Sequence, residues 1–411
     1  MTDDITLISP TADELRDWIQ PLVSAFYEDF AEGEFESERS LLEPSRLVGA
    51  FDGEQRIGSA GAFSMRLTVP GGEVPASAIT AVGVLPDHRR RGVMRQMLDW
   101  VIADARDRDE PVAVLWASEA AIYQRFGFGN GTLSSHFEVE RSRIAFRKPL
   151  PSGDGVRIRL VSPEEAFRLF LPIYESVRTT VPGSLSRPVI RWKNQLLPDA
   201  EWMRHGNGPK YLAVLEVDGQ PRGYAIYRIK SDWDPRGPKS NLLVSELFGL
   251  DPEAEQALWE WVFAMDLVGT VRGWRQPLPN PLQQWVIEPR RLGLTIGDGL
   301  WLRLLDVPAA LEARTYAGEG TVVMDLHDPM IDANAGRWQV AVRGGRASVT
   351  RTEAETDLTL DVAALASVYL GAVRFGDLHR AGRVRVANAD ALQTADVAFT
   401  SFRAPFCNTM F

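Results

Sequence analysis

AVGVLPDHRRRGVMRQML, residues 81–98, is the stretch that decides the fold of this chain. The apolar run 79–85 predicts a buried strand, and Pro86 ends it. After three arginines, Gly92 precedes a helix that the spacing of apolar residues over 93–101 predicts. A strand that leads through a glycine turn into a helix N-terminus forms a natural anion site, because unpaired N–H groups and the positive end of the helix dipole point at the ligand.

Arg90, Arg91 and Arg95 flank this turn and add the positive charge that suits a diphosphate and a sugar phosphate. A run of arginines alone is more often a solvated face or a generic anion patch, and that alternative stays open. The stretch is not a P-loop, because no G-K-[ST] closes the turn, and a dinucleotide G-x-G-x-x-G is absent. Strand, turn and helix together favour a phosphate-bearing ligand.

The same order of residues resembles the cofactor-binding motif of the GCN5-related N-acetyltransferases, in which R-x-x-G-x-G/A cradles the pyrophosphate of acetyl-CoA. Here the motif reads RRRGVM over 89–94, so Met94 replaces the last small residue. In this resemblance Val82 and Val84 pair with the pantetheine arm in the manner of an added strand. The residues that it assigns to acetyl-CoA are Val82, Gly83, Val84, Arg90, Arg91, Gly92, Val93, Met94, Arg95, Ser118 and Glu119. Ser118 is more often a helix N-cap than a ligand contact.

The composition, 45% hydrophobic and 24% charged, is typical of a soluble globular protein, and 411 residues predict two or three domains. A net charge of −10 argues against a nucleic-acid protein and suits a cationic substrate. Cys407 is the single cysteine, which excludes an internal disulfide and a multi-cysteine metal site. The five histidines include no short-spaced pair, so we expect no metal.

The first residues, MTDDITLISP, lack the basic and apolar regions of a signal peptide. No apolar run approaches the length of a membrane span. We therefore expect a cytoplasmic protein without a membrane span.

Residues 1–150 alternate strands and helices around the quoted stretch. The expected order is a strand at Ile5–Ile8, a helix through Phe26, a hairpin turning at Asp52, the central strand and helix, a strand at Val112–Ala117 and a helix at Ser118–Phe126. This succession predicts an α/β domain.

Residues 151–290 repeat part of that order after a linker at Pro151–Gly155. Strands flank a turn at Asp218, and an apolar strand over 241–250 ends before a proline as the earlier one does. Glu253-Ala-Glu-Gln then stands where the first copy has arginines and glycine. Carboxylates suit a helix N-terminus but repel a diphosphate, so we predict a degenerate second copy that keeps the fold and has lost the cofactor.

Residues 291–411 read as strands followed by helices, which predicts an α+β domain. A strand at Leu300–Leu304 leads into a helix capped by Asp306. Antiparallel strands are expected at Gly320–His327, Gly336–Arg343 and Arg346–Arg351, before a helix over 363–370. This order resembles the sterol-carrier-protein-like domains. The whole fold is thus expected to be two tandem acetyltransferase-like domains, the second degenerate, followed by a sterol-carrier-protein-like α+β domain.

Over nearly its full length the chain resembles the enhanced intracellular survival (Eis) acetyltransferases of actinobacteria. The most specific segments are HRRRG at 88–92, ASE at 117–119, IYQRFGF at 122–128, WLRLLDVPAALEAR at 301–314 and YLGA at 369–372. The resemblance implies acetyl-CoA as co-substrate and an N-acetyltransferase acting on primary amines of aminoglycosides, polyamines or lysine side chains. It also implies a homohexamer.

The resemblance assigns proton donation to Tyr123 and the general base to the C-terminal carboxylate of Phe411. Both roles make chemical sense, because a tyrosine with an ordinary pKa of about 10 is a neutral donor and a free α-carboxylate, with a pKa of about 3.3–3.7, is ionised at neutral pH. Packing of Tyr123 against its aromatic neighbours, and a terminal phenylalanine with no chemical role, remain the alternatives.

Glu28 and Asp29 are candidates for binding the cationic substrate, because Met410 is not acidic and a carboxylate next to the chain end is missing. Acidic loop residues are solvated in most proteins, which is the alternative for both. A different class of function is also open: a lipid- or acyl-CoA-binding protein without transferase activity, with the third domain as its binding part.

Overall fold

A computed structural model describes residues 5–148 and 155–411, which form two compact units. The first unit comprises Met1–Thr132, Leu300–Pro405 and Thr409–Phe411, and the second comprises Leu133–Gly299 and Phe406–Asn408. Residues 151–154 of the predicted linker Pro151–Gly155 lie outside the described residues.

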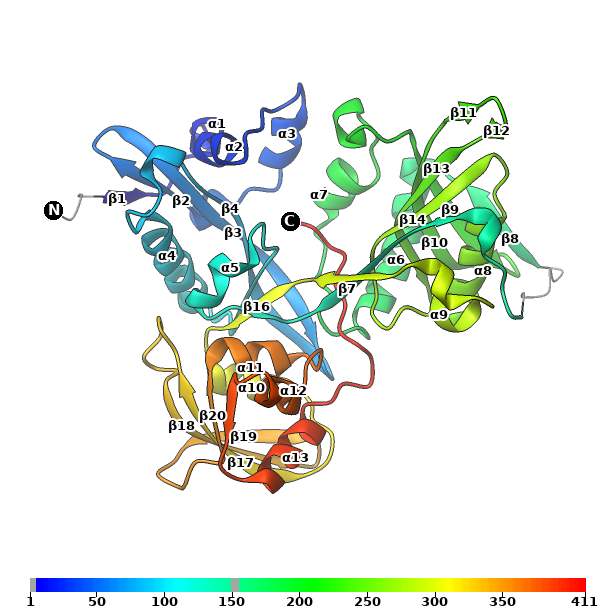
Figure 1. The fold of residues 1–411 in the computed structure, drawn as a ribbon. Coiled ribbons are helices and arrows are strands. Elements are labelled where there is room, and N and C mark those ends of the chain that lie inside the picture. The colour runs from blue at the N-terminus through cyan, green and yellow to red at the C-terminus, as the bar shows by residue number, and fades with distance from the viewer. Residues whose placement is uncertain (1–4, 149–154) are drawn as a thin grey trace. The chain divides into compact units, whose positions relative to one another are not determined.

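The first unit contains a seven-stranded sheet in the order β1-β2-β3-β4-β5-β16-β6 (Figure 1). Its strands are β1 (Ile5–Ile8), β2 (Leu47–Asp52), β3 (Gln55–Val69), β4 (Gly72–Val84), β5 (Val112–Leu115), β6 (Gly129–Asn130) and β16 (Trp301–Leu304). The sequence predicted the hairpin at Asp52 and the strand at the quoted stretch, and both are confirmed.

Strand β16 joins this sheet from a distant part of the chain. It pairs antiparallel with β5, where Trp301 faces Leu115, and with β6, where Leu302 faces Gly129. The apolar residues at 300–304 predicted a strand here, but their pattern does not indicate which strands it pairs with. Conversely, β7 (Leu133–Glu140) pairs in the sheet of the second unit.

Helices cover both faces of the first sheet. They are α1 (Leu15–Trp18), α2 (Gln20–Phe26), α3 (Glu34–Arg39), α4 (Val93–Asp107) and α5 (Ala120–Tyr123). Val48 belongs to the core cluster beneath α4, whereas its neighbour Leu47 belongs to the cluster beneath α1 and α2, because successive strand residues point to opposite faces. The single helix expected to run through Phe26 is divided, and Pro21 stands in the first turn of the second piece.

The rest of the first unit forms a five-stranded sheet in the order β19-β18-β17-β20-β21 with helices packed on it (Figure 1). The strands are β17 (Gly320–His327), β18 (Gly336–Arg343), β19 (Arg346–Arg351), β20 (Leu358–Asp361) and β21 (Val384–Val386). The helices are α10 (Val307–Ala313), α11 (Val362–Tyr369), α12 (Phe375–Arg380) and α13 (Ala389–Ala398). The predictions of three antiparallel strands and of the Asp306 cap are confirmed.

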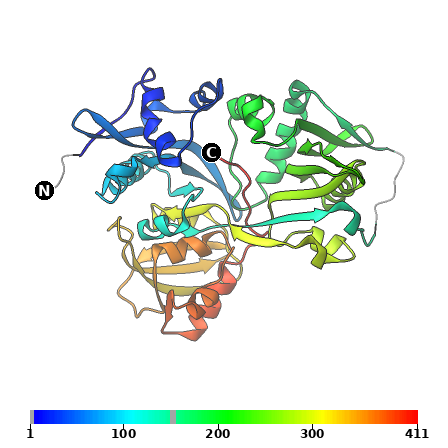
Figure 2. The same ribbon diagram turned by 45° about the horizontal axis from the view of Figure 1, so that its top comes forward.

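The second unit, largely green in Figure 2, holds a seven-stranded sheet in the order β15-β7-β14-β13-β10-β9-β8. Besides β7, the strands of this sheet are β8 (Val156–Leu160), β9 (Lys210–Val217), β10 (Gln220–Lys230), β13 (Ser240–Gly249), β14 (Val268–Gln276) and β15 (Thr295–Asp298). The short strands β11 (Trp233–Asp234) and β12 (Gly237–Pro238) form a separate two-stranded sheet. Its helices are α6 (Pro163–Arg178), α7 (Val189–Arg191), α8 (Pro252–Ala264) and α9 (Leu282–Trp285). Helices α6 and α8 pack over separate core clusters of this sheet.

A buried ion pair fixes the turn that follows α5. Arg303 on β16 donates to Asp328 at 2.6 Å, and neither side chain is exposed. Gly127 ends the turn with a φ of 83°, and a Cβ at this position would overlap the Arg303 guanidinium. Glycine is therefore required here both by the backbone and by the neighbouring cation.

Gly127→Ala should destabilise the protein by about 3 kcal/mol or more, because the new methyl group displaces a buried guanidinium from its carboxylate. Urea unfolding of the variant measures this. Gly344→Ala is the matched control, since Gly344 also has a positive φ of 56° but its Cβ would meet no described atom within 4 Å. The control should cost only about 1–2 kcal/mol. Equal losses in the two variants would contradict the steric role of Arg303.

Candidate active site

Strands β4 and β5 part where the quoted stretch begins. Their parallel pairing joins Ala76–Ala78 to Val112–Val114, while β4 continues to Val84. A bulge interrupts β4 at Ala81, which has a φ of 53° and whose carbonyl accepts a hydrogen bond from Ser59 Oγ at 3.0 Å. The edge of β4 that carries Val82 and Val84 therefore lies beyond the ladder with β5. Backbone groups on such an edge can pair with an extended ligand.

The N-terminus of α4 meets the end of this strand. Gly92 is the N-cap with a φ of 83°, and in the described part of the chain no side chain caps the helix. A Cβ at Gly92 would meet none of the described atoms within 4 Å, so the approach to the helix end is open. The fifteen-residue helix directs its first N–H groups and its positive dipole end at this space. Binding of an anion at this helix start stays a prediction of the sequence.

The arginines of the turn have different surroundings. Arg91 donates to Asp52 at 2.9 Å, and Arg89 donates to the carbonyl of Ala25 at 3.1 Å. Arg90 is exposed, and Arg95 lies with its guanidinium carbon 5.6 Å from the centre of the Phe126 ring. Sequence reasoning read Asp52 only as a turn residue and missed its role as the partner of an arginine.

The remaining residues assigned to acetyl-CoA lie on these same elements. Val93 is buried at the start of α4, Met94 is half-buried, and Glu119 and Ser118 are exposed after β5. Gly83 is the point at which α2 approaches β4, because a Cβ there would contact the backbone of Leu22. The close packing of α2 thus supplies a structural reason for a glycine in this position.

Tyr123 follows β5 on the short helix α5 and is 6% exposed. Its ring meets that of Phe128 edge to face, with 6.0 Å between the centroids. Burial, with a smaller effect from the charge of Glu119, raises the pKa of Tyr123 to about 12, so its hydroxyl is protonated at neutral pH. The helix expected over Ser118–Phe126 is shorter: α5 is followed by a 3-10 turn at Gln124–Phe126, and Ser118 does not cap it.

The last residues of the chain meet the same strand end. Trp116, the residue directly after β5, donates its indole N–H to the carbonyl of Thr409 at 2.9 Å. Thr409 is 2% exposed, and Phe411 is half-buried in the same unit. No local sequence pattern predicts this contact, because its partners are 293 residues apart.

The three residues before Thr409 are held within the second unit. The N–H of Phe406 donates to the carbonyl of Pro182 at 2.8 Å. The side-chain amide of Asn408 donates to Glu246 at 2.9 Å, and Arg187 pairs with the same carboxylate at 2.6 Å. Arg187 and Glu246 are both buried, so this part of the tail is anchored by a desolvated ion pair.

The candidate substrate residues Glu28 and Asp29 are exposed in the loop after α2. Asp29 accepts the N–H of Phe30 at 2.9 Å. The loop starts near the arginine turn, because Arg89 bonds the carbonyl of Ala25 at the end of α2. The structure describes no contact between these two carboxylates and Tyr123.

The equivalent helix start in the second unit is closed. Asp251 caps α8 by accepting the N–H of Ala254 at 2.7 Å, and its carboxylate also pairs with Arg222. A Cβ on Gly249 would contact the backbone of Ala254 and Glu255, so the strand end lies directly against the helix. At the start of α8 an acidic side chain already accepts a helix N–H, and the neighbouring strand blocks the approach. An anion therefore does not find here the open helix end that α4 provides.

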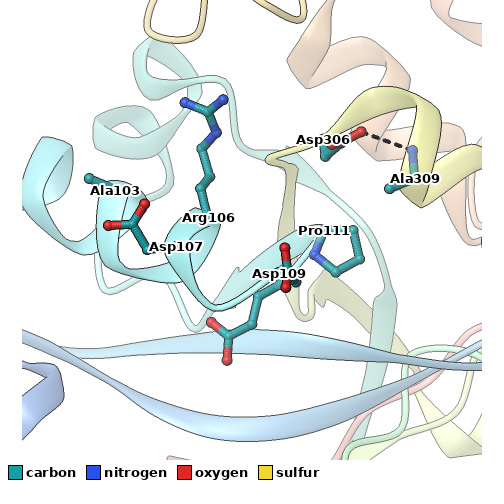
Figure 3. Close-up of a pocket in the computed structure, with 8 residues that line it drawn as sticks. Ala103, Arg106, Asp107, Asp109, Pro111, Asp306 and Ala309 are labelled. Atoms are coloured by element: carbon teal, nitrogen blue, oxygen red, sulfur yellow. Dashed lines mark hydrogen bonds between the residues drawn. The ribbon is translucent and has the colours of Figure 1, made fainter.

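A hollow of about 340 Å³ lies elsewhere in the first unit, between the end of α4 and the start of α10 (Figure 3). Since α4 is about 22 Å long, this hollow is far from the arginine turn at the other end of that helix. Two of its carboxylates are engaged: Asp306 accepts the N–H of Ala309 at 2.9 Å, and Glu110 pairs with Arg46. This hollow therefore does not replace the strand edge as the candidate site.

Within residues 5–148 and 155–411, no group of three His, Cys, Asp or Glu side chains could hold a metal ion. None of the helices described in the two units is long and apolar enough to cross a membrane.

Comparison with protein families identifies three regions. The Acetyltransferase (GNAT) domain matches residues 6–131, and a second Acetyltransferase (GNAT) domain matches residues 183–304. The Sterol carrier protein domain matches residues 307–408. The expected fold of two acetyltransferase-like domains followed by a sterol-carrier-protein-like domain is thereby confirmed.

Relatives match the chain from end to end. An uncharacterized N-acetyltransferase of Streptomyces avermitilis is 40% identical over 99% of both chains. The N-acetyltransferase Eis of Mycobacterium tuberculosis is 35% identical over 97% of both. The crystal structure of Eis1 from Mycobacterium abscessus superposes with a TM-score of 0.84 and 33% identity, covering 99% of this chain and 100% of the other. These matches confirm that the chain is an acetyltransferase.

Gly92→Glu should weaken the binding of coenzyme A at least tenfold, because a carboxylate then occupies the space in front of α4 and repels a diphosphate. Isothermal titration calorimetry measures the affinity, and Gly344→Glu, on a turn of the other sheet, controls for an added charge. The unmodified chain should bind one coenzyme A, since the start of α8 is closed. Unchanged affinity in folded Gly92→Glu, or two sites per chain, would contradict this assignment.

Proposed function

The chain belongs to the Eis-like GNAT N-acetyltransferases of actinobacteria, and we propose that it acetylates primary amines of cationic substrates with acetyl-CoA as the donor. The substrate class comprises aminoglycosides, polyamines and lysine side chains. The observation that carries the proposal is the meeting of three features in one unit: the open edge of β4, the uncapped start of α4 and a buried tyrosine after β5. A net charge of −10 favours the approach of a cation.

Acetyl-CoA fits the chemistry of these residues. The edge of β4 at Val82–Val84 offers backbone donors and acceptors to the pantetheine amides. The first N–H groups of α4 suit the diphosphate, and the exposed Arg90 supplies a mobile cation beside it. Ser118 and Glu119, at the end of β5, flank the thioester end in this proposal. Met94 differs from the family's small residue, but its half-buried side chain leaves the open approach at Gly92 unaffected.

The proposed reaction is direct attack. The neutral amine attacks the thioester carbonyl, so that a C–N bond forms and the C–S bond breaks. The amine gives up one proton to a base, and the departing sulfur receives one proton from an acid, so that the products are an amide and free coenzyme A. A backbone N–H on the edge of β4 stabilises the negative charge that develops on the carbonyl oxygen.

Tyr123 is the proposed acid. Its raised pKa keeps the hydroxyl protonated over the physiological range, so it can donate but does not compete as a base. The Phe411 carboxylate is the proposed base. The contact between Trp116 and the Thr409 carbonyl supports this role, because it holds the end of the chain beside the end of β5. Glu28 and Asp29 are proposed to attract the substrate cation from their exposed loop.

The assembly and location are also proposals that follow from the family. We propose a homohexamer in the cytoplasm, acting without nucleic-acid partners or a metal. Light scattering of the purified protein measures the assembly, and a mass of six chains is expected.

The activity is tested by thiol release from acetyl-CoA in the presence of polyamines, aminoglycosides and lysine peptides. Turnover with at least one cationic amine is expected, and a neutral amide analogue of the same acceptor should be inert. Absence of turnover across the panel, together with tight binding of fatty acids, would instead support a lipid-binding protein.

Tyr123→Phe should lower kcat by about 100-fold or more and leave coenzyme A affinity unchanged, because it removes a proton donor and keeps the ring. In the unmodified enzyme, this group should cause no fall in kcat between pH 7 and about 10, since an ordinary tyrosine would already be half ionised at the upper value. Phe128→Leu controls for the loss of aromatic packing alone. A Tyr123→Phe enzyme with kcat within about twofold of the original would make this tyrosine structural.

Adding one glycine after Phe411 should lower kcat/KM by about 10²–10⁴-fold, because the carboxylate becomes a neutral amide and the charge moves by about one residue length. Phe411→Ala keeps the terminal charge and should be milder. A passively docked tail predicts the reverse order of the two variants. Steady-state kinetics with thermal melts separates loss of chemistry from loss of folding.

A further inference from the structure

We propose that Trp116 is a positioning residue for the C-terminal carboxylate, acting through the main chain of Thr409. The inference rests on the proposed role of Phe411 and adds to it the group that sets the place of the base. The indole N–H of Trp116 donates to the Thr409 carbonyl at 2.9 Å, two residues before the chain ends.

Trp116 is attached to a strand that is paired on both of its edges. It follows Leu115, the last residue of β5, which is 1% exposed and pairs with Trp301 of β16. On its other side β5 pairs with β4 through Val114 and Ala78. A strand held on both edges moves little, so the indole N–H is presented at a fixed place relative to the parting of β4 and β5.

The acceptor is equally well placed. Thr409 is 2% exposed, whereas Met410 after it is 45% exposed. An extended chain advances at most about 3.6 Å per residue, so the Phe411 carboxylate lies no more than about 7 Å beyond the anchored carbonyl. The hydrogen bond from Trp116 fixes the position of the Thr409 carbonyl, and loss of the bond would shift the residues that follow it. A base that is displaced by about 1 Å already loses much of its effect.

The chemistry of indole restricts the role. Its N–H is a donor only and takes up no proton, so Trp116 cannot itself serve as the base. The proposed acid lies soon after the same strand end, because Tyr123 is the last residue of the short helix α5, which follows Trp116. Trp116 therefore holds the proposed base in a fixed position relative to β5, the strand that the proposed acid follows.

The test is a double-mutant cycle between Trp116→Phe, which keeps a ring but removes the N–H, and the one-glycine C-terminal extension. Trp116→Phe alone should lower kcat/KM about tenfold through kcat, with the KM for acetyl-CoA unchanged. In the extended enzyme, whose carboxylate is already displaced, the same substitution should cost less than about twofold. Trp100→Phe, which removes an indole from α4 in the same unit, is the matched control.

The four kinetic outcomes are distinct. A damaging extension with a non-additive Trp116→Phe supports the proposal. A damaging extension with a silent Trp116→Phe overturns it and leaves the base assignment standing. Additive losses overturn it in favour of a merely structural tryptophan. A harmless extension overturns both the carboxylate base and the positioning role.

A second measurement does not depend on activity. Carboxypeptidase digestion followed by mass spectrometry reports how fast Phe411 is removed from the folded protein. Trp116→Phe should speed this removal at least fivefold, while Trp100→Phe leaves it unchanged. Equal removal rates in all three proteins would overturn the anchoring of the tail by Trp116.

Discussion

The ladder between β4 and β5 ends at Ala78 and Val114, and the candidate site depends on where it ends. Backbone groups on the continuing edge of β4 need hydrogen-bond partners, which a neighbouring strand no longer supplies. A bulge at Ala81 interrupts this strand, and α4 begins at Val93, after the strand has ended at Val84. The end of the ladder leaves an edge to which an extended ligand can pair, and the glycine N-cap of α4 leaves a helix end that an anion can approach.

The two acetyltransferase-like domains show what this arrangement requires. At the start of α4 a glycine leaves the helix uncapped, whereas at the start of α8 the Asp251 carboxylate accepts the N–H of Ala254. The carboxylate stabilises its helix and excludes a diphosphate by charge and by contact. A difference of a few residues therefore leaves the start of α4 open to an anion and closes the start of α8.

The sequence predicted those elements that are determined by interactions between residues close together in the chain. Gly92 before an amphipathic helix, the turns at Asp52 and Asp218, and the Asp306 cap all act within a few residues of themselves, so their pattern is readable. The pairing of β16 with β5 and the bond from Trp116 to Thr409 join distant segments, and apolar periodicity does not encode a partner. The division of the first helix at Pro21 was readable from its proline and was missed. Tyr123 could be named from the family motif, but only the structure gives its burial and its raised pKa.

The central claim is that the edge of β4 and the start of α4 together receive the acyl donor. Amide hydrogen exchange with and without coenzyme A tests it most directly, because the claim concerns backbone N–H groups. Coenzyme A should slow exchange at Val82–Val84 and at Val93–Arg95, and leave Glu253–Glu255 at the start of α8 unchanged. Protection at α8, or none at β4 and α4 when binding is saturated, would contradict the account.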